Sequence, residues 1–300
     1  MSNFFESLRK AELIGSAEFP LTAPENTGLA VEAKSPPGAA RSDRSSTTAH
    51  PAPLSHELND ACRTASLRVS KSAPVLLFEE EGQGLATEEY RLIRTKILHH
   101  PSKPKMLVVS SSGSGDGKTV TAINLSAAFA LKAGSRVALI DADMRHPQVA
   151  SYLGLSVSPG LTEVLTGATT FEKAALCIQE LPNLWVLPAG EQHQNQAELL
   201  ESDRWRQFVH ALRQNFDYVI FDAPPAGAVA DYDSVQLAAD GVIFVARPDY
   251  SRRGACIETL ETIPKQKLLG VVLNCVEPWF LWRRKRYGYY RYEQPAAKAS

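Results

Sequence analysis

Residues 106–119 read MLVVSSSGSGDGKT, an apolar run that enters a glycine-rich loop ending in Gly-Lys-Thr. A helical pattern follows over Val120–Leu131. A strand, such a loop and a helix in this order are the setting of a phosphate-binding P-loop. The glycines let backbone N–H groups turn toward phosphate oxygens, and the helix presents its positive end to the same anion. The strict pattern begins with glycine. Here Ser112 stands at that position, and Gly113 and Gly115 can supply the flexibility instead.

The residues of this loop have expected parts in holding a nucleotide. Lys118 can reach the β- and γ-phosphates, and the Thr119 hydroxyl can ligate Mg²⁺. Asp116 carries a charge that opposes phosphate, so its side chain is expected to face outward. The predicted nucleotide-binding residues of the loop are Gly113, Ser114, Gly115, Asp116, Gly117, Lys118, Thr119 and Val120.

Carboxylates follow two further apolar runs. Residues 137–145 read VALIDADMR, and residues 218–225 read YVIFDAPP. Ligands bind at the carboxyl ends of parallel strands, and carboxylates there suit a hard divalent ion beside nucleotide phosphates. Together with the P-loop they favour a site for Mg²⁺ and a nucleotide over separate helix caps. The predicted metal ligands are Thr119, Asp141 and Asp222, and Asp143 lies beside them.

The fold class follows from the alternation of apolar and helical segments. The apolar runs are near-continuous, as strands buried on both faces should be. We expect an α/β protein with a doubly wound, mainly parallel sheet flanked by helices, the architecture of P-loop nucleotide-binding proteins. Within the runs already quoted, strands are expected at 106–110, 137–140 and 218–221. Further strands are expected at 184–187, 242–245 and 268–273, and further helices at 203–214 and 253–262.

Composition bounds the remaining possibilities. The chain has 300 residues and a net charge of −1, which gives no general argument for nucleic acid as a partner. Its four cysteines are widely spaced, which fits a reducing cytoplasm and argues against a zinc site or a disulfide framework. No apolar run approaches the length that spans a bilayer, and the N-terminus does not read as a signal peptide.

Four zones are expected along the chain. Residues 1–15 carry an apolar stripe typical of a short amphipathic helix. Residues 16–75 are rich in Pro, Ser, Thr and Ala and read as a disordered linker. Residues 76–280 form the globular domain, and residues 281–300 form a basic, tyrosine-rich tail.

The P-loop, VALIDADMR and YVIFDAPP together resemble the Walker A, Walker A′ and Walker B segments of the bacterial tyrosine kinases of exopolysaccharide and capsule systems. Residues 141–145 match the family's DxDxR pattern in full. The resemblance implies ATP and Mg²⁺ as cofactors, Lys118, Asp141 and Asp143 as catalytic residues, and either aspartate as the base. It further implies that Asn274, after the last core strand, contacts the adenine.

A charged segment and a terminal cluster extend the resemblance. Residues 88–94, EEYRLIR, match the ExxRxxR motif at the subunit interface of ring-forming kinases in this family. The motif residues are Glu88, Arg91 and Arg94, which the spacing is expected to place on one helical face. The tail resembles the family's autophosphorylation segment, and its expected phosphoacceptors are Tyr287, Tyr289, Tyr290 and Tyr292.

The charge of the tail suggests how phosphorylation acts. Residues 279–300 hold six Lys or Arg against one Glu, a net of +5. Four phosphotyrosines would add about −6 to −8, enough to invert that sign. We therefore predict that unmodified tails dock in neighbouring active sites to form a homo-oligomeric ring, and that phosphorylated tails leave.

The resemblance also implies a setting in the cell. The protein is expected in the cytoplasm, peripheral to the inner face of the cell membrane, bound there through a polysaccharide chain-length regulator that acts as its activator. A protein tyrosine phosphatase is expected to reverse its action. The expected function is tyrosine autophosphorylation that regulates exopolysaccharide or capsule synthesis and export.

Two other functions are compatible with a P-loop. A nucleotide-switched positioning ATPase is the main rival, but that class typically carries a second lysine at the place of Gly113. A non-catalytic scaffold needs none of the polar residues that are intact here. The tyrosine tail separates a kinase from both.

Overall fold

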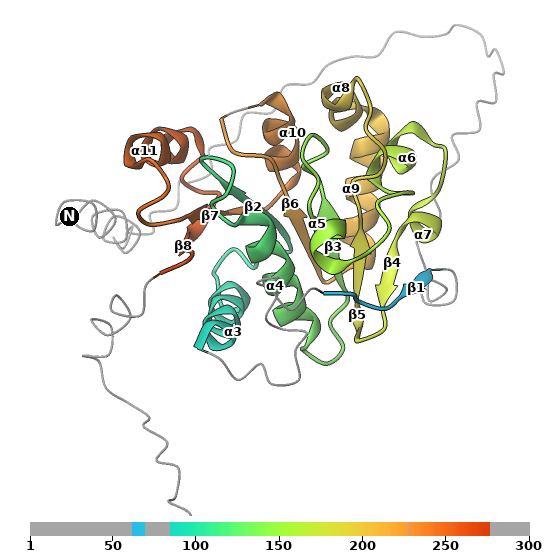
Figure 1. The fold of residues 1–300 in the computed structure, drawn as a ribbon, viewed down its shortest axis with the longest axis horizontal. Coiled ribbons are helices and arrows are strands. Elements are labelled where there is room, and N and C mark those ends of the chain that lie inside the picture. The colour runs from blue at the N-terminus through green and yellow to red at the C-terminus, as the bar shows by residue number, and fades with distance from the viewer. Residues whose placement is uncertain (1–61, 70–84, 228, 277–300) are drawn as a thin grey trace, which may run out of the picture. The chain divides into compact units, whose positions relative to one another are not determined.

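The computed structural model describes residues 62–69, 85–227 and 229–276. Within them an eight-stranded sheet runs in the order β1-β4-β5-β3-β6-β2-β7-β8 (Figure 1). Neighbouring strands are parallel except β4 and β5. The expected mainly parallel α/β sheet is confirmed. The strands are β1 Arg63–Ala65, β2 Met106–Ser111, β3 Val137–Asp141, β4 Leu176–Ile178, β5 Leu181–Leu187, β6 Tyr218–Asp222, β7 Gly241–Ala246 and β8 Leu268–Leu273.

Helices cover both faces of this sheet. One apolar core lies against α3, α4 and α5, and the other lies against the later helices. Every residue of β2, β3 and β7 is buried, which explains their continuously apolar sequences. The helices are α3 Leu85–Leu98, α4 Lys118–Ala130, α5 Val149–Leu153, α6 Leu161–Thr166, α7 Phe171–Ala174, α8 Gln196–Glu201, α9 Asp203–Asn215, α10 Ala230–Ala238 and α11 Arg253–Thr262.

Helix α4 explains how the P-loop is held in place. Its residues from Thr119 to Ala130 are all buried, because α3 lies over one side of the helix and the sheet lies under the other. Small residues such as Ala122 and Ala127 let it approach the strands closely. The Phe129 ring packs 4.3 Å from the Tyr218 ring, measured between centroids. The helix that begins at the P-loop is thus a rigid part of the core.

The predicted linker is wrong over its last part. Arg63–Ala65 forms β1, which pairs with β4 at the edge of the sheet. Glu180 accepts hydrogen bonds from the Ser66 hydroxyl and the Leu67 N–H, and the Arg68 N–H donates to the Leu153 carbonyl. The local sequence does not predict this strand, because it is held by partners more than 80 residues away. The ordered domain therefore includes residues before 76.

Strand β4 was also not expected. Its three residues are too few to show a periodic pattern, and it turns directly into β5 in an antiparallel hairpin. The predicted N-terminal helix and tyrosine tail lie outside the described residues. None of the described helices is long and apolar enough to cross a membrane.

Candidate active site

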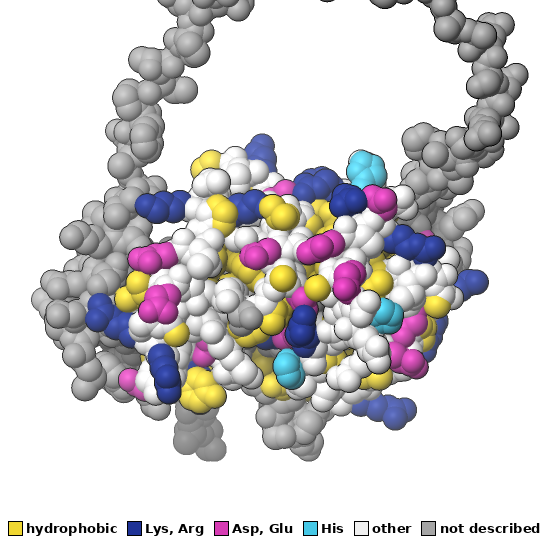
Figure 2. All heavy atoms as spheres, turned by 90° about the horizontal axis from the view of Figure 1, so that it is seen from above, with side chains coloured by type: hydrophobic (Ala, Val, Ile, Leu, Met, Phe, Trp, Pro, Cys, Tyr) yellow, Lys and Arg dark blue, Asp and Glu magenta, His cyan; other side chains and the backbone are white. Residues whose placement is uncertain are grey.

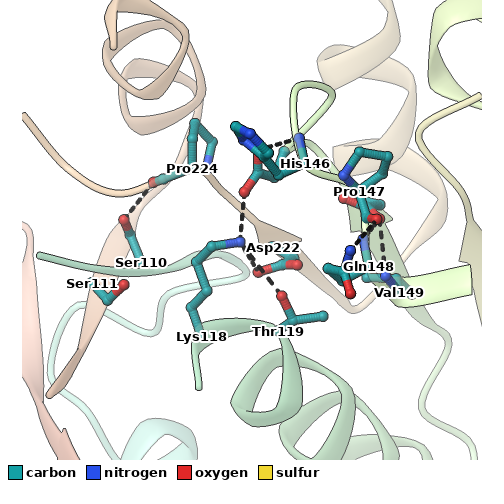
Figure 3. A network of polar contacts seen from close by, with 12 residues as sticks. Ser110, Ser111, Lys118, Thr119, His146, Pro147, Gln148, Val149, Asp222 and Pro224 are labelled. Atoms are coloured by element: carbon teal, nitrogen blue, oxygen red, sulfur yellow. Dashed lines mark hydrogen bonds and ion pairs between the residues drawn. The ribbon is translucent and has the colours of Figure 1, made fainter. Parts of the chain in front are cut away.

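The order of the central strands brings the motifs together. Strand β6 lies between β3 and β2, so that Asp141 and Asp222 face each other in register at the carboxyl edge beside the P-loop. The Ser110 hydroxyl donates to the Pro224 carbonyl over 2.7 Å and ties the end of β2 to the segment after β6 (Figure 3). The site is thus formed by three adjacent strand ends, as parallel topology predicts.

Glycine is required at the turn into α4. Gly117 precedes the helix with φ +93°, a left-handed conformation that L side chains rarely adopt. A Cβ there would also lie 1.8 Å from the Asn274 side-chain nitrogen. Lys118 and Thr119 then begin the helix, so the positive end of α4 points into the loop. The local geometry is that of an anion-binding loop.

Lys118 forms ion pairs with two of the strand-end carboxylates. Its Nζ lies 2.7 Å from Asp143 Oδ2 and 3.5 Å from Asp222 Oδ1, and 3.4 Å from the Thr119 hydroxyl (Figure 3). Burial lowers the pKa of Lys118, but the neighbouring carboxylates of Asp222 and Asp143 outweigh it and raise the pKa overall. Lys118 is therefore a fixed positive charge among these carboxylates.

The two register-paired aspartates keep oxygens without hydrogen-bond partners. Asp141 Oδ2 accepts from the N–H groups of Gln148 and Val149 at the start of α5, both at 3.1 Å. Asp141 Oδ1 and both oxygens of Asp222 accept no hydrogen bond from the described residues, and Asp222 Oδ1 has only the ion pair with Lys118 at 3.5 Å. Burial raises the pKa of both carboxyls; their mutual repulsion adds to this for Asp141, and Lys118 offsets part of it for Asp222. Such orphaned buried oxygens mark a place for a cation.

These oxygens fit Mg²⁺ in company with phosphate. The Thr119 side chain is buried beside them, which supplies a third hard oxygen. Among the described residues there is no cluster of three or more His, Cys, Asp or Glu that could hold a metal by itself. Mg²⁺ commonly takes one or two carboxylates and completes its shell with water and substrate phosphates. The donor set therefore suits a metal that arrives with its nucleotide.

Asp143 and Arg145 are each held by a specific partner. Asp143 Oδ1 accepts from the His146 N–H at 3.1 Å while its other oxygen pairs with Lys118. Arg145 forms two hydrogen bonds to the buried carboxylate of Asp231, at 2.7 and 3.0 Å. The loop after β3 is thereby fixed at both ends. Asp231 was not singled out from the sequence, where it looks like any acid in a first helical turn.

The expectation that Asp116 faces outward is wrong. Only 2% of its surface is exposed, and its side chain folds back into the loop. Asp116 accepts hydrogen bonds from the Ser112 hydroxyl, the Gly113 N–H and the Ser251 hydroxyl. These donors satisfy the carboxylate inside the protein, so it need not turn to solvent. No sequence motif pointed to Ser251.

Asn274, which follows β8, lies at the P-loop. Its side-chain amide donates to the Asp116 carbonyl over 3.1 Å. Its Oδ1 accepts from the N–H of Cys275 at 2.9 Å. A contact with adenine stays a prediction.

The three residues of the α3 motif do not share one environment. Arg91 pairs with Glu88; the Glu88 side chain is exposed and that of Arg91 is half-buried. Arg94 instead donates to the Ala128 carbonyl at the end of α4 over 2.7 Å. This contact with a last-turn carbonyl stabilises the helix within the subunit. An interface role for this helix remains a prediction, and the tail tyrosines lie outside the described residues.

Charge on the surrounding surface is mixed. Figure 2 shows acidic and basic side chains interspersed over the face seen from above, without one continuous field of either sign. The strong charges of the site are therefore local ones, those of Lys118 and the strand-end carboxylates.

Comparisons with known proteins agree with this geometry. A family model described as an AAA domain matches residues 104–270, more than half of the chain. The tyrosine-protein kinase YwqD of Bacillus subtilis (strain 168) is 36% identical over 214 residues, which cover 70% of this chain and 88% of that protein. The tyrosine-protein kinase CpsD of Streptococcus agalactiae is 32% identical over 198 residues, 65% of this chain and 86% of the relative.

A solved structure gives the same result. The chimerical protein CapA2B2 matches with a TM-score of 0.64 and 28% identity, over 71% of this chain and 94% of that one. The resemblance inferred from the three Walker segments is thus confirmed by sequence and by fold. The chain belongs to the bacterial tyrosine-protein kinases of the capsule and exopolysaccharide family, built on an AAA-type P-loop domain.

Proposed function

We propose that this kinase transfers the γ-phosphoryl group of ATP to the tyrosines of a neighbouring copy's C-terminal tail. The observation that carries the proposal is the arrangement around Lys118, whose ammonium group lies among buried carboxylates directly after the P-loop. In the transfer a tyrosine oxygen bonds to the γ-phosphorus while the bond to the ADP oxygen breaks, and the tyrosine proton passes to a carboxylate. The acceptors are Tyr287, Tyr289, Tyr290 and Tyr292.

The residues divide the work by charge. Backbone N–H groups of residues 114–119 and the Lys118 side chain hold the phosphates and stabilise charge on the transferring group, while the Gly113 N–H donates to Asp116. Thr119, Asp141 and Asp222 would hold Mg²⁺, which supplies positive charge against the β- and γ-phosphate oxygens when bound. A tyrosine hydroxyl with an ordinary pKa of about 10 is mostly protonated at neutral pH, so a base assists its attack. Asp141 and Asp143 are both candidates for that base.

Assembly and location complete the proposal. Glu88 is exposed and Arg91 is half-buried on α3, and their paired side chains suit contact with a second copy in a ring. A basic tail is attracted to a neighbouring site rich in carboxylates, and phosphorylation reverses that attraction. The N-terminal segment is the proposed tether to a membrane-bound chain-length regulator at the inner face of the cell membrane, and a tyrosine phosphatase resets the tail.

Mass spectrometry of the tail tests the proposal. After incubation of the full chain with Mg·ATP, we expect phosphate on Tyr287–Tyr292, and the Lys118→Met variant should lose this by about 10³-fold because a charge aimed at the transferring group is gone. Arg206→Met on the exposed surface of α9 is the matched control and should label normally. ATP hydrolysis without tail labelling would instead favour a nucleotide-switched positioning ATPase.

Size-exclusion chromatography tests the ring. We expect the unmodified chain to elute as an oligomer that dissociates after Mg·ATP treatment. An oligomer that survives complete tail phosphorylation contradicts tail docking, even where the kinase activity itself is confirmed.

A further inference from the structure

The buried carboxylate of Asp116 is unusual because it stands inside a loop that binds anions. It lies two residues before Lys118, yet it makes no ion pair with that lysine among the contacts described. Instead its two oxygens are used separately. Oδ2 accepts from the Ser112 hydroxyl and the Gly113 N–H, both at 3.2 Å, and Oδ1 accepts from the Ser251 hydroxyl at 2.5 Å.

The Oδ2 contacts account for the departure from the P-loop pattern. Ser112 occupies the position of the first glycine, and its side chain is tied down by the aspartate four residues later. The Gly113 N–H points to the same oxygen. The start of the loop is therefore fixed by its own fifth residue, Asp116, while Ser114 and Gly115 remain exposed. Serine is accommodated here because an internal acceptor holds it.

The Oδ1 contact reaches a different element, the loop between β7 and α11. Ser251 donates to Asp116 and accepts from the Arg247 N–H at 2.8 Å, so one hydroxyl joins the two loops. From the same loop Tyr250 packs against Gly115, where a Cβ would lie 2.7 Å from the tyrosine oxygen. The Arg247 guanidinium carbon lies 4.8 Å above the Tyr250 ring. The P-loop is thus supported along its length by a segment 135 residues away.

The backbone of Asp116 is held from a third direction. Its carbonyl accepts from the Asn274 amide, and the Asn274 N–H donates to the Ala246 carbonyl at 2.9 Å. The ends of β7 and β8 are thereby linked to the same residue. Three elements distant in sequence converge on one buried side chain and its carbonyl.

We infer that Asp116 is a positioning residue that, with Ser251, holds the P-loop in its phosphate-binding shape. This inference rests on nucleotide binding at the P-loop, which is part of the proposed function. Asp116 does not touch the phosphates in this role. It fixes Ser112 and Gly113 so that the later N–H groups of the loop are oriented before a nucleotide arrives, which reduces the ordering cost of binding.

Titration calorimetry with the full chain in Mg²⁺ buffer tests the inference, with ADP and inorganic tripolyphosphate as probes. Asp116→Asn should weaken both by about tenfold, because asparagine offers one uncharged acceptor oxygen to the three donors that now bond a carboxylate. Ser251→Ala should weaken both by about threefold, and Ser251→Thr, which keeps the hydroxyl, should restore binding. The double variant should be no weaker than Asp116→Asn alone, because the two changes remove one shared contact.

Controls separate positioning from loss of folding. Asp203→Asn changes an aspartate whose side chain is 84% exposed, and it should bind both probes as the wild type does. Ser251→Ala removes only one hydroxyl, so it folds even where Asp116→Asn does not. In tail phosphorylation, the Ser251→Ala variant should raise KM for ATP and leave kcat within about twofold.

Three outcomes overturn the inference. Unchanged binding of both probes shows that the contacts do not shape the loop. Weaker binding of ADP alone places the effect at the nucleoside. Tighter binding shows that the carboxylate competes with phosphate for the Gly113 N–H. If the wild-type chain itself binds no ADP, the proposed function fails and the inference fails with it, whereas the other results leave the proposed function intact.

Discussion

The carboxylates at the two ends of the central strands differ in their hydrogen bonding and in the direction of their pKa shifts. At the amino end, Asp240 accepts from the N–H groups of Lys105 and Met106 at 2.9 Å each and forms two hydrogen bonds with Arg213. At the carboxyl end, Asp141 and Asp222 keep three oxygens without such partners. Burial tends to raise the pKa of Asp240, but Arg213 and the two backbone groups outweigh it and lower the pKa overall, whereas the pKa values of Asp141 and Asp222 are raised.

This difference separates stability from chemistry. A carboxylate with every acceptor site satisfied stabilises the fold, and one left unsatisfied in a buried place destabilises it until a ligand binds. Asp240 joins the starts of β2 and β7 to α9. Asp222, at the carboxyl end of β6 beside β2, accepts no hydrogen bond from the described residues and has only the ion pair with Lys118, at 3.5 Å. At the amino ends of the strands the half-buried carboxylate of Asp240 is hydrogen-bonded at both oxygens. At the carboxyl ends, the buried carboxylates of Asp141 and Asp222 keep oxygens that can bind a ligand.

Removing the charge at the open edge should give the largest effect. Asp222→Asn should lower tail phosphorylation by about 10²–10³-fold, because a proposed metal ligand is lost. The melting temperature without nucleotide should stay equal or rise, since a buried carboxylate with a raised pKa costs stability once pH exceeds its ordinary value. A clear fall in melting temperature would show that Asp222 stabilises the fold as Asp240 does, and would contradict the proposed difference between the two ends of the strands.

The reverse pattern is expected at the saturated edge. Asp240→Asn should reduce the free energy of unfolding by about 1–3 kcal/mol, because hydrogen bonds to a charged group are weakened. Tail phosphorylation per folded molecule should be unchanged. Urea denaturation measures the first quantity and the tail assay the second. Lost activity in fully folded protein would show that this end also serves the reaction.

The pH dependence of that stability difference sharpens the comparison. Because the folded-state pKa of Asp240 is lowered, its carboxylate stabilises the fold fully above the ordinary pKa of about 4 and loses this contribution as pH falls through the folded-state pKa. The gap between wild type and Asp240→Asn should therefore be constant from about pH 6 to 8 and shrink toward zero below about pH 4. A gap that grows on acidification contradicts the assigned sign.

The smallest effect is expected at Asp217, also at the amino end. It accepts one backbone hydrogen bond, from the Arg136 N–H at 2.8 Å, and its side chain is 43% exposed. Asp217→Asn should cost about 0.5 kcal/mol or less in urea denaturation, since water can replace much of the contact. A cost as large as that of Asp240→Asn would mean that position at this edge matters more than burial.

The sequence predicted correctly those features that depend on a local pattern within one segment. The strand before the P-loop, its glycines and the strand-end aspartates are local patterns, and the sheet brings them together as expected. Sequence reasoning missed β1 and β4. Each has three residues, too few to show a periodic apolar pattern, and β1 forms only because it pairs with a strand distant in sequence. Arg94 was grouped by helical spacing, although the carbonyl it reaches belongs to α4.

The sequence by itself determined the fold class, the family and the residues at the carboxyl edge of the sheet, because buried strands and phosphate loops require particular residues in consecutive order. Only the tertiary structure decided which carboxylates have all their oxygens hydrogen-bonded and which keep oxygens without such a partner. Asp116 illustrates the reason. Its sequence neighbours suggest repulsion from phosphate, but its partner Ser251 is 135 residues away, and the charge is accommodated by contacts that exist only once the chain has folded.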